Sequence, residues 1–326
     1  MSSSQYVLFF DIYYHFYAIV GLILQLFLLF LIFKKSPSSL EHLKYFLYNT
    51  CITQIALVLS TFSSQHRVLP NLGSTAILPR GPCKLIGPKT CFTMYHIYTA
   101  LGADAGIAIS STVLFRYLVL TRNSFGPKQI AILIIAAHFF PFILLLVPFT
   151  DTWNFEAVRN VTHAEHPKYD LSIYEPFVGF ADTQSIQFLV GTAILTLGAY
   201  CVPLISALLT RQVLVLIRQH QNMSDRTKKQ ATTLIYGLIW QTLFPISIYI
   251  PIYSCYLYTQ STGEEILLTE HLFLALASLP GLVDPLISFY FVVPYRAYIL
   301  TSLGLKKPIV YRETIAVTCS VMAAGK

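Results

Sequence analysis

Two acidic residues, Asp104 and Asp284, stand alone in long apolar stretches of the chain. A carboxylate in such surroundings is costly and is a functional candidate by default. It could bind a cation, take up a proton, or hydrogen-bond neighbouring helices as a conformational latch. The plainer interpretation is a structural carboxyl that pairs with polar residues of the first two apolar stretches, namely Gln25, Asn49, Thr53 and Gln54. We favour a structural or latch role over direct contact with a ligand.

Tyrosines form a second group with a chemically useful spacing. Tyr249, Tyr253 and Tyr256 are spaced i, i+4 and i+7, so they share one face of a helix. Tyr95 and Tyr98 share a face of another helix in the same way. Two such faces could flank an apolar, aromatic cavity that suits a small organic molecule. The alternative is an aromatic belt at a membrane interface.

Prolines interrupt three of the apolar stretches, at Pro203, Pro245 and Pro285. Each proline removes a backbone hydrogen bond and tends to kink its helix. Kinked helices suit a switch between two states, although kinks also occur as inert features of membrane bundles. We take Pro245 and Pro285, together with Asp104 and Asp284, as candidate switch residues.

Signals for catalysis and for metal or cofactor binding are weak. His163 and His166 have the spacing of a metal pair, but they lie in an acidic stretch without cysteine, which indicates solvated histidines. The sequence has no phosphate-binding loop, no dinucleotide fingerprint and no His-Glu-x-x-His pattern. We therefore expect no catalytic residues, no metal and no cofactor, and we predict that the protein is not an enzyme.

The composition indicates which elements carry these residues. Of the 326 residues, 55% are apolar and only 11% are charged, and the mean hydropathy is +0.61. A soluble domain carries about a quarter charged residues, so these values exclude an ordinary cytosolic enzyme, a disordered chain and a nucleic-acid-binding domain. They indicate a membrane protein. The net charge of +7 fits loops that face an anionic leaflet, and we expect no nucleic-acid partner.

Seven nearly uncharged segments are long enough to cross a bilayer, which takes about 20 residues per helix. Backbone amides in lipid must be paired within their own segment, so we predict an all-α membrane protein, a seven-transmembrane helix bundle. The expected spans are residues 12–33, 45–64, 91–117, 129–150, 183–213, 231–258 and 270–294. Residues 1–295 would form the transmembrane domain and residues 296–326 a cytoplasmic tail.

Positive charge predicts the orientation of this bundle. With the N-terminus outside, the inner segments hold 16 Lys and Arg residues and the outer segments hold 6. Cytoplasmic loops of membrane proteins are enriched in these residues. We therefore expect an extracellular N-terminus and a cytoplasmic C-terminus.

Small residues surround Asp104. The segment Gly102-Ala-Asp-Ala-Gly106 has small residues four apart, a pattern that lets transmembrane helices approach closely. We expect the third span to be central in the bundle, with Asp104 facing away from lipid. On the outer side, Asn160 begins an Asn-Val-Thr sequon and is expected to carry a glycan, whereas the sequon at Asn222 lies in an inner loop and is expected to be silent.

The cysteines divide by compartment. Cys83 and Cys91 lie on the outer, oxidising side, where a disulfide between them is possible, and Cys255 is a competing partner. Cys51 and Cys201 lie within spans, and we expect both to be small buried apolar residues.

Several motifs resemble those of rhodopsin-like G-protein-coupled receptors. Phe115-Arg116-Tyr117 is similar to their Asp-Arg-Tyr motif with Phe in place of the acid, and Cys91 stands 25 residues earlier, where those receptors place a cysteine. Asp284-Pro285 resembles the start of their seventh-helix motif, and Trp240 with Pro245 is loosely similar to their sixth-helix switch. Two features depart from that family. The second outer loop has no cysteine for the usual bridge to the third helix, and the missing acid removes a restraint on the resting state.

Along its full length the chain resembles the nematode serpentine chemoreceptors, and class delta in particular. The residues that carry this resemblance are Lys35-Ser-Pro-Ser-Ser-Leu40, Asn49-Thr50 with Thr53-Gln54, the Gln65-x-Arg67 stretch, Gly81-Pro82-Cys83-Lys84, Phe115-Arg116-Tyr117 and Asp284-Pro285. The resemblance implies a plasma-membrane receptor of sensory neurons that detects an external chemical and signals through a heterotrimeric G protein.

On this basis we expect three partners: a small external molecule such as an odorant, a heterotrimeric G protein and the lipid bilayer. The ligand would contact Tyr95, Tyr98, Tyr249, Tyr253 and Tyr256, and the G protein would contact Arg116, Tyr117, Arg218, Arg226, Lys228 and Lys229. One alternative is a ligand-gated cation channel of inverted topology, against which the charge distribution argues. A small-solute transporter, for which two isolated carboxylates are weak support, and a purely structural membrane protein are the others.

Overall fold

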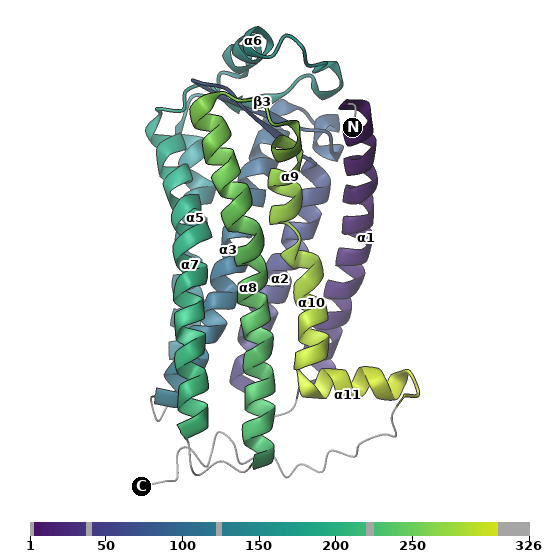
Figure 1. Ribbon diagram of the computed structural model, residues 1–326, viewed down its shortest axis with the longest axis vertical. Coiled ribbons are helices and arrows are strands. Elements are labelled where there is room, and N and C mark those ends of the chain that lie inside the picture. Colours follow the sequence, from purple (N-terminus) through teal and green to yellow (C-terminus); the bar gives the residue numbers. More distant parts are fainter. Residues whose placement is uncertain (1–2, 37–40, 122–125, 220–224, 306–326) are drawn as a thin grey trace.

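The computed structural model describes residues 3–36, 41–121, 126–219 and 225–305, which form a bundle of long helices with a small cap at one end (Figure 1). Six helical spans are long and apolar enough to cross a membrane, and a bent pair of helices makes up to a seventh. The mostly helical, multi-span architecture predicted from the sequence is confirmed. Asn222, Cys319 and the rest of the chain after residue 305 lie outside the described residues.

Five helices are long and unbroken: α1 (Ser3–Lys35), α2 (Glu41–Ser64), α3 (Pro88–Thr121), α7 (Ile186–Gln219) and α8 (Asp225–Thr262). The fourth span consists of α4 (Pro127–Ala137), α5 (Phe139–Leu146) and the 3-10 turn η3 (Val147–Thr150). The bent pair consists of α9 (Leu267–Ala277) and α10 (Pro280–Phe291), which meet at 42°. Helix α11 (Val293–Ser302) lies across the end of the bundle opposite the cap (Figure 1).

Prolines explain why two predicted spans are not continuous helices. Pro280 has no backbone N–H to donate and stands at the start of α10, so the helix is interrupted at the two residues before it. Pro141 likewise cannot donate to the backbone oxygen four residues earlier, at Ala137, which is where α4 ends. The spans expected over 129–150 and 270–294 are thus built from shorter helices, the first from α4, α5 and η3 and the second from the bent pair α9 and α10. Helices α7 and α8, by contrast, continue through Pro203 and Pro245.

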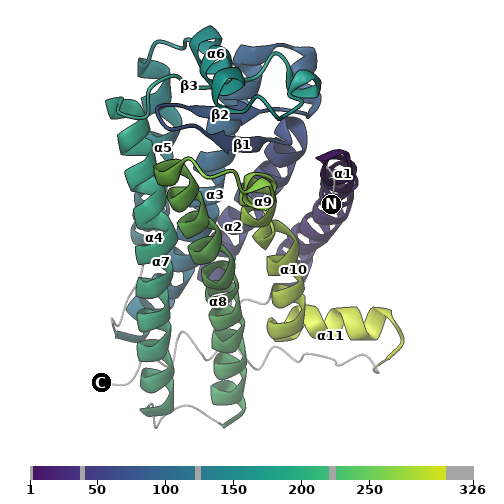
Figure 2. The ribbon, with the colours of Figure 1, turned by 45° about the horizontal axis from the view of Figure 1, so that its top comes forward.

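The cap is built on a three-stranded antiparallel sheet in the order β1-β2-β3, which the predicted all-α fold lacks. Strands β1 (Arg67–Pro70) and β2 (Thr75–Leu78) form a hairpin between α2 and α3, and β3 (Val178–Phe180) comes from the segment before α7. Helix α6 (Phe155–Glu165) lies over the sheet, on the side away from the bundle (Figure 2). Two further 3-10 turns, η2 (Pro82–Leu85) and η4 (Ser172–Tyr174), complete the cap.

Both faces of this sheet are buried, because side chains alternate along a strand. Val68 and Ile77 join a cluster with tyrosines of α3 and α8, so this face closes the end of the bundle. Leu69 and Ala76 belong to a separate cluster with side chains of α6 and the segment that follows it. Strand β3 passes so close at Gly179 that an added Cβ would lie 2.1 Å from a backbone oxygen of β2, so only glycine fits there.

A disulfide joins Cys83 of η2 to Cys91 of α3, while Cys255 is a free, exposed cysteine. Cys51 is buried, whereas Cys201 is exposed on α7, so the expectation of a buried thiol is wrong for Cys201. The reason is that α7 lies at the edge of the bundle, with most of its apolar side chains facing outward.

Candidate functional site

A cavity of about 120 Å³ lies between α3, α7, α8 and α9. Three of the five tyrosines expected at a ligand site line it: Tyr98, Tyr249 and Tyr253. The other two stand between the cavity and the cap. Tyr95 contacts the ring of His66 edge to face, and Tyr256 stacks on Phe273 with the ring centres 4.6 Å apart.

Glycines create much of the room in this cavity. Gly102 and Gly106 of α3 and Gly198 of α7 line it, and a Cβ added at any of the three would have no atom within 4 Å. The expectation that the small residues around Asp104 bring another helix into close contact is therefore wrong at both glycines of that segment. They open a space instead of closing one.

The cavity wall is apolar and electrically neutral. None of its lining residues, all of which belong to the described part of the chain, is charged. The tyrosine hydroxyls already donate to backbone oxygens: Tyr98 to Leu274 at 2.8 Å, Tyr249 to Ala277 at 3.1 Å, and Tyr253 to Thr192 at 3.2 Å. The Ser110 hydroxyl donates to Gly106 at 2.9 Å. The oxygens of Tyr253 and Ser110 also accept hydrogen bonds, from Thr196 and Ser206, so the oxygens of Tyr98 and Tyr249 are the ones more available as acceptors than as donors to a bound molecule.

Asp104 links three spans through a polar cluster. Its Oδ2 accepts a hydrogen bond from Thr53 of α2 at 2.8 Å, and its Oδ1 lies 2.7 Å from Nδ1 of His138, at the junction of α4 and α5. His138 Nε2 lies 3.0 Å from Oδ1 of Asn49, which also belongs to α2. Thr53 is one of the expected partners of Asp104, whereas Asn49, also expected, contacts His138 and not the carboxylate. His138 was missed, although it is a polar residue in an otherwise apolar run.

Asp284 links α10 to the first two helices. It accepts a short hydrogen bond from Nε2 of Gln54, whose Oε1 accepts from Nε2 of Gln25 at 2.6 Å. Gln25 also donates to the backbone oxygen of Gly281 at 2.8 Å, next to the break between α9 and α10. Asp284 Oδ1 is buried and has no hydrogen-bond partner among the described residues. Pro285, one residue later, is buried in the same helix.

At the end opposite the cap, Arg116 and Tyr117 of α3 are partly buried. Phe115, which replaces the acid of the receptor motif, is buried and stacks on Phe46 of α2 at 4.6 Å. Arg218 is exposed near the end of α7. The side chains of Arg226, Lys228 and Lys229 lie outside the described residues, although the backbone there is part of α8.

The sequence also singled out Trp240, Pro245 and Asn160. Trp240, which is loosely similar to the sixth-helix switch residue, is 55% exposed on α8, whereas Pro245 of the same helix lines the cavity. Asn160, the expected glycan acceptor, is exposed on α6.

The cap contains a buried ion pair that the sequence did not predict. Arg67 of β1 donates to Glu270 of α9 at 2.9 Å through Nε, and both side chains are almost fully buried. Tyr169 donates to the same carboxylate at 3.1 Å, and its ring lies 4.9 Å below the guanidinium. Burial is the largest effect and opposes the charge on Arg67, but Glu270 and Tyr174 together outweigh it through their charges and hydrogen bonds, and they raise the pKa of Arg67 above its usual value.

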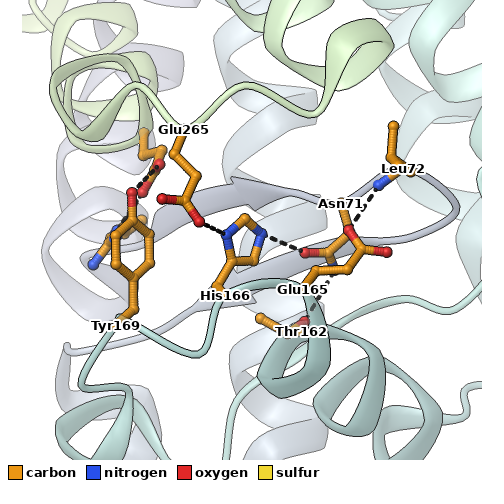
Figure 3. Close-up of polar contacts among 9 residues, drawn as sticks. Asn71, Leu72, Thr162, Glu165, His166, Tyr169 and Glu265 are labelled. Atoms are coloured by element: carbon orange, nitrogen blue, oxygen red, sulfur yellow. Dashed lines mark hydrogen bonds and ion pairs between the residues drawn. The ribbon is translucent and has the colours of Figure 1, made fainter.

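The two loop histidines differ in environment. His163 lies on the surface of α6, 2.9 Å from a carboxylate oxygen of Glu175, as expected for a solvated histidine. His166 is buried between Glu265 and Asn71, so the expectation of a solvated ring is wrong for it (Figure 3). The part of the chain that the structure describes contains no group of three or more His, Cys, Asp or Glu side chains suited to a metal ion.

Comparison with known proteins agrees with this architecture. The serpentine seven-transmembrane chemoreceptor family Srd matches residues 10–301. Serpentine receptor class delta-59 of Caenorhabditis elegans is 50% identical over 299 residues, with 92% of each chain covered. Serpentine receptor class delta-51 of the same organism is 32% identical over 291 residues, which cover 89% of this chain and 85% of the relative.

Among solved structures, squid rhodopsin superposes with a TM-score of 0.61 at 12% identity, covering 100% of this chain and 93% of that one. This likeness concerns the fold alone. The sequence matches extend over nearly the whole length of both partners, and the helical bundle has the matching architecture. The chain belongs to the Srd family of serpentine seven-transmembrane chemoreceptors.

Proposed function

We propose that this chain is a chemosensory G-protein-coupled receptor whose ligand binds in the cavity between α3, α7, α8 and α9. Family membership and the rhodopsin-like fold support a receptor. The observation that carries the choice of site is the cavity itself, where three glycines leave space beneath three tyrosines. Tyr95 and Tyr256, one layer further out, would support the ring positions of that site.

The wall chemistry restricts the ligand. A charged molecule would lose its hydration without meeting an opposite charge, which costs several kcal/mol in a medium of low dielectric constant. The hydroxyls of Tyr98 and Tyr249 donate to the backbone already, so the ligand gains most by burying apolar surface and donating a hydrogen bond. We therefore propose a small, neutral, largely apolar organic ligand.

The ligand would act by shifting the population of two helix arrangements. Pro203 and Pro245 lie in the cavity wall, so a bound molecule would press on α7 and α8 at the positions where a proline removes one backbone hydrogen bond. Asp104 and Asp284 hold the remaining spans together through polar contacts that would reform in a second arrangement, and Pro285 leaves one backbone hydrogen bond of α10 unmade beside Asp284. Both carboxylates thus serve as latches in this proposal.

Arg116, Tyr117 and Arg218 would meet a heterotrimeric G protein at the end opposite the cap, together with Arg226, Lys228 and Lys229. The excess of Lys and Arg predicted for this side favours a cytoplasmic location for it, with the N-terminus outside. Residues 1–295 would then form the receptor domain in the plasma membrane of a sensory neuron, and residues 296–326 a cytoplasmic tail. The family and the fold do not favour the inverted channel or the transporter.

Asn160 would carry a glycan on the outer side. Its sequon ends in Thr162, whose side chain is fully buried and hydrogen-bonded beneath α6. The glycan would therefore be attached before the cap folds. Labelling of an N-terminal epitope on intact cells, together with glycosidase sensitivity that disappears in Asn160→Gln, tests this orientation. A hidden epitope would contradict it.

The ligand site is tested by filling the cavity. Gly106→Leu places a side chain in empty space and should abolish responses of transfected cells to every active compound in a panel of neutral odorants, read as G-protein activation. Gly73→Leu is the matched control, since this glycine also has nothing within 4 Å but lies in the hairpin turn of the cap. Equal responses of wild type and Gly106→Leu, at equal surface expression, would place the ligand elsewhere.

A further inference from the structure

One histidine joins all three connections at the cap end of the bundle (Figure 3). His166 follows α6, and its Nδ1 lies 2.7 Å from Oε1 of Glu265, between α8 and α9. Its Nε2 lies 3.0 Å from Oδ1 of Asn71, in the turn between β1 and β2. The residue is only 4% exposed, so water does not compete freely for these contacts.

Thr162 determines which amide atom of Asn71 faces the ring. The Thr162 hydroxyl donates its single proton to the backbone oxygen of Val158 at 2.7 Å. It must therefore accept in its 3.0 Å contact with Nδ2 of Asn71. Nδ2 also lies 2.7 Å from the hydroxyl of Ser74. The amide oxygen is consequently the atom that faces His166.

Both ring nitrogens of His166 thus face hydrogen-bond acceptors, a carboxylate oxygen and an amide oxygen. A neutral imidazole carries one N–H and an imidazolium carries two. When Glu265 is ionised, only the protonated ring makes both hydrogen bonds. If the proton sits on Glu265 instead, the carboxyl donates to Nδ1 and the neutral ring donates from Nε2 to Asn71, so the pair again holds one extra proton. We propose that His166 with Glu265 is a proton-binding site, and that the bound proton fastens the cap over the cavity.

The surrounding charges favour a cation at this position. Tyr169 stacks on the His166 ring with centres 5.5 Å apart, and Glu165 is the preceding residue, whose carboxylate accepts from the backbone N–H of the hairpin turn at 3.1 Å. Arg67, on the far side of Tyr169, is neutralised by its ion pair with Glu270. The charged groups with contacts to these elements among the described residues therefore include two carboxylates, Glu165 and Glu265, and the compensated pair Arg67–Glu270.

The proton is thus a regulatory ligand of the receptor. Only the role of the cavity beneath the cap rests on the proposed function. Loss of the proton breaks one of the two hydrogen bonds and so weakens the attachment of the segment after α6 to the hairpin or to the α8–α9 connection. Raising the external pH should therefore loosen the cap, and acidification should close it.

The experiment measures exposure of a buried position in the sheet. Ala76 of β2 is fully buried, so Ala76→Cys in a Cys255→Ser background is shielded while the cap is closed. Labelling by a membrane-impermeant maleimide is measured on intact cells at two pH values, about 6 and about 8. Each rate is divided by that of an exposed reference, Gln184→Cys, which cancels the pH dependence of thiol reactivity.

We expect the relative rate to rise about threefold or more between the two pH values, as a local opening equilibrium linked to one proton requires. His166→Phe should give a high rate at both pH values, and Glu265→Gln should reduce the pH dependence without removing the ring. His163→Phe is the matched control on the same helix, and it should keep the wild-type dependence because His163 pairs only at the surface.

A relative rate in wild type that does not depend on pH would overturn the proposal. So would a dependence that survives in His166→Phe or is lost in His163→Phe. If His166→Phe does not reach the cell surface, Glu265→Gln decides the question alone. No ligand or G protein enters this assay, so a chain that never signals can still show the proton-dependent cap, and a fully active receptor can fail to show it.

Discussion

Replacing Glu270 by glutamine is expected to lower the free energy of unfolding by about 3–5 kcal/mol. The carboxylate receives hydrogen bonds from Nε of Arg67 at 2.9 Å, from Nη2 of the same guanidinium, and from Tyr169 at 3.1 Å. The Arg67 side chain is only 3% exposed, so the substitution leaves a full positive charge buried without a counter-charge. The penalty comes from that orphaned cation more than from the lost attraction.

The assay is thermal unfolding of the purified receptor in detergent. For a chain of this size, each kcal/mol corresponds to about 2–3 °C, so Glu270→Gln should lower the melting temperature by roughly 6–15 °C. Replacing both members of the pair by methionine removes the orphaned charge, and should leave the receptor within about 2 kcal/mol of wild type. Asp11→Asn is the control, because Asp11 and Arg80 lie 3.9 Å apart with about a third of each side chain exposed.

That exposed pair should contribute less than about 1 kcal/mol. The reasoning is refuted if Glu270→Gln and Asp11→Asn have the same effect. The free energy of unfolding of the double methionine variant should also be compared with those of Arg67→Met and Glu270→Met. If the double variant loses the sum of the two single losses, the reasoning is refuted, because Arg67 and Glu270 would then stabilise the cap through independent contacts and not through charge compensation.

Three further predictions concern single buried groups. Burial lowers the pKa of His66 to about 3, so the folded state holds this ring neutral. The unfolded chain binds a proton there below the ordinary histidine pKa of about 6.5, so the melting temperature should fall as the pH drops below that value. His66→Phe should make this fall less steep. Thr53→Val removes the hydroxyl that donates to Asp104 while keeping the shape, and should cost about 1–3 kcal/mol in thermal unfolding. Gly281→Ala places a methyl 2.7 Å from the Tyr17 hydroxyl and should cost about 1–3 kcal/mol, part of which Tyr17→Phe should restore in a double-mutant cycle.

The spans and several buried polar contacts were predictable because lipid imposes simple rules. An apolar run of sufficient length must be a helix, and polar side chains within such runs must find one another. Few polar residues lie in the first two spans, so the choice of partners for Asp104 and Asp284 was small, and Thr53, Gln54 and Gln25 were named. His138 carries the same signal, but a histidine does not stand out by formal charge as an aspartate does.

The cap was not predictable in the same way. Its sheet is encoded in two loops that are separated in the chain by α3, α4 and α5, and Arg67 meets a residue more than 200 positions later. The burial of His166 depends on that arrangement, because its partners belong to the other two loops. The rotation of each helix about its own axis could not be predicted from the sequence either. When a span is apolar all round, nothing in its pattern tells whether Cys201 or Trp240 faces lipid or protein.

Glycines show most clearly why sequence pattern and structural role come apart here. Gly281 lies where α10 approaches α1, and even one methyl group would collide with Tyr17. Gly106 has empty space in the same direction, although it too is a glycine within an apolar helix. Alanine at 106 would gain helix propensity of about 1 kcal/mol and meet no clash. Close packing therefore does not require glycine at position 106. Its missing side chain leaves part of the cavity open, and the proposed ligand would occupy that space.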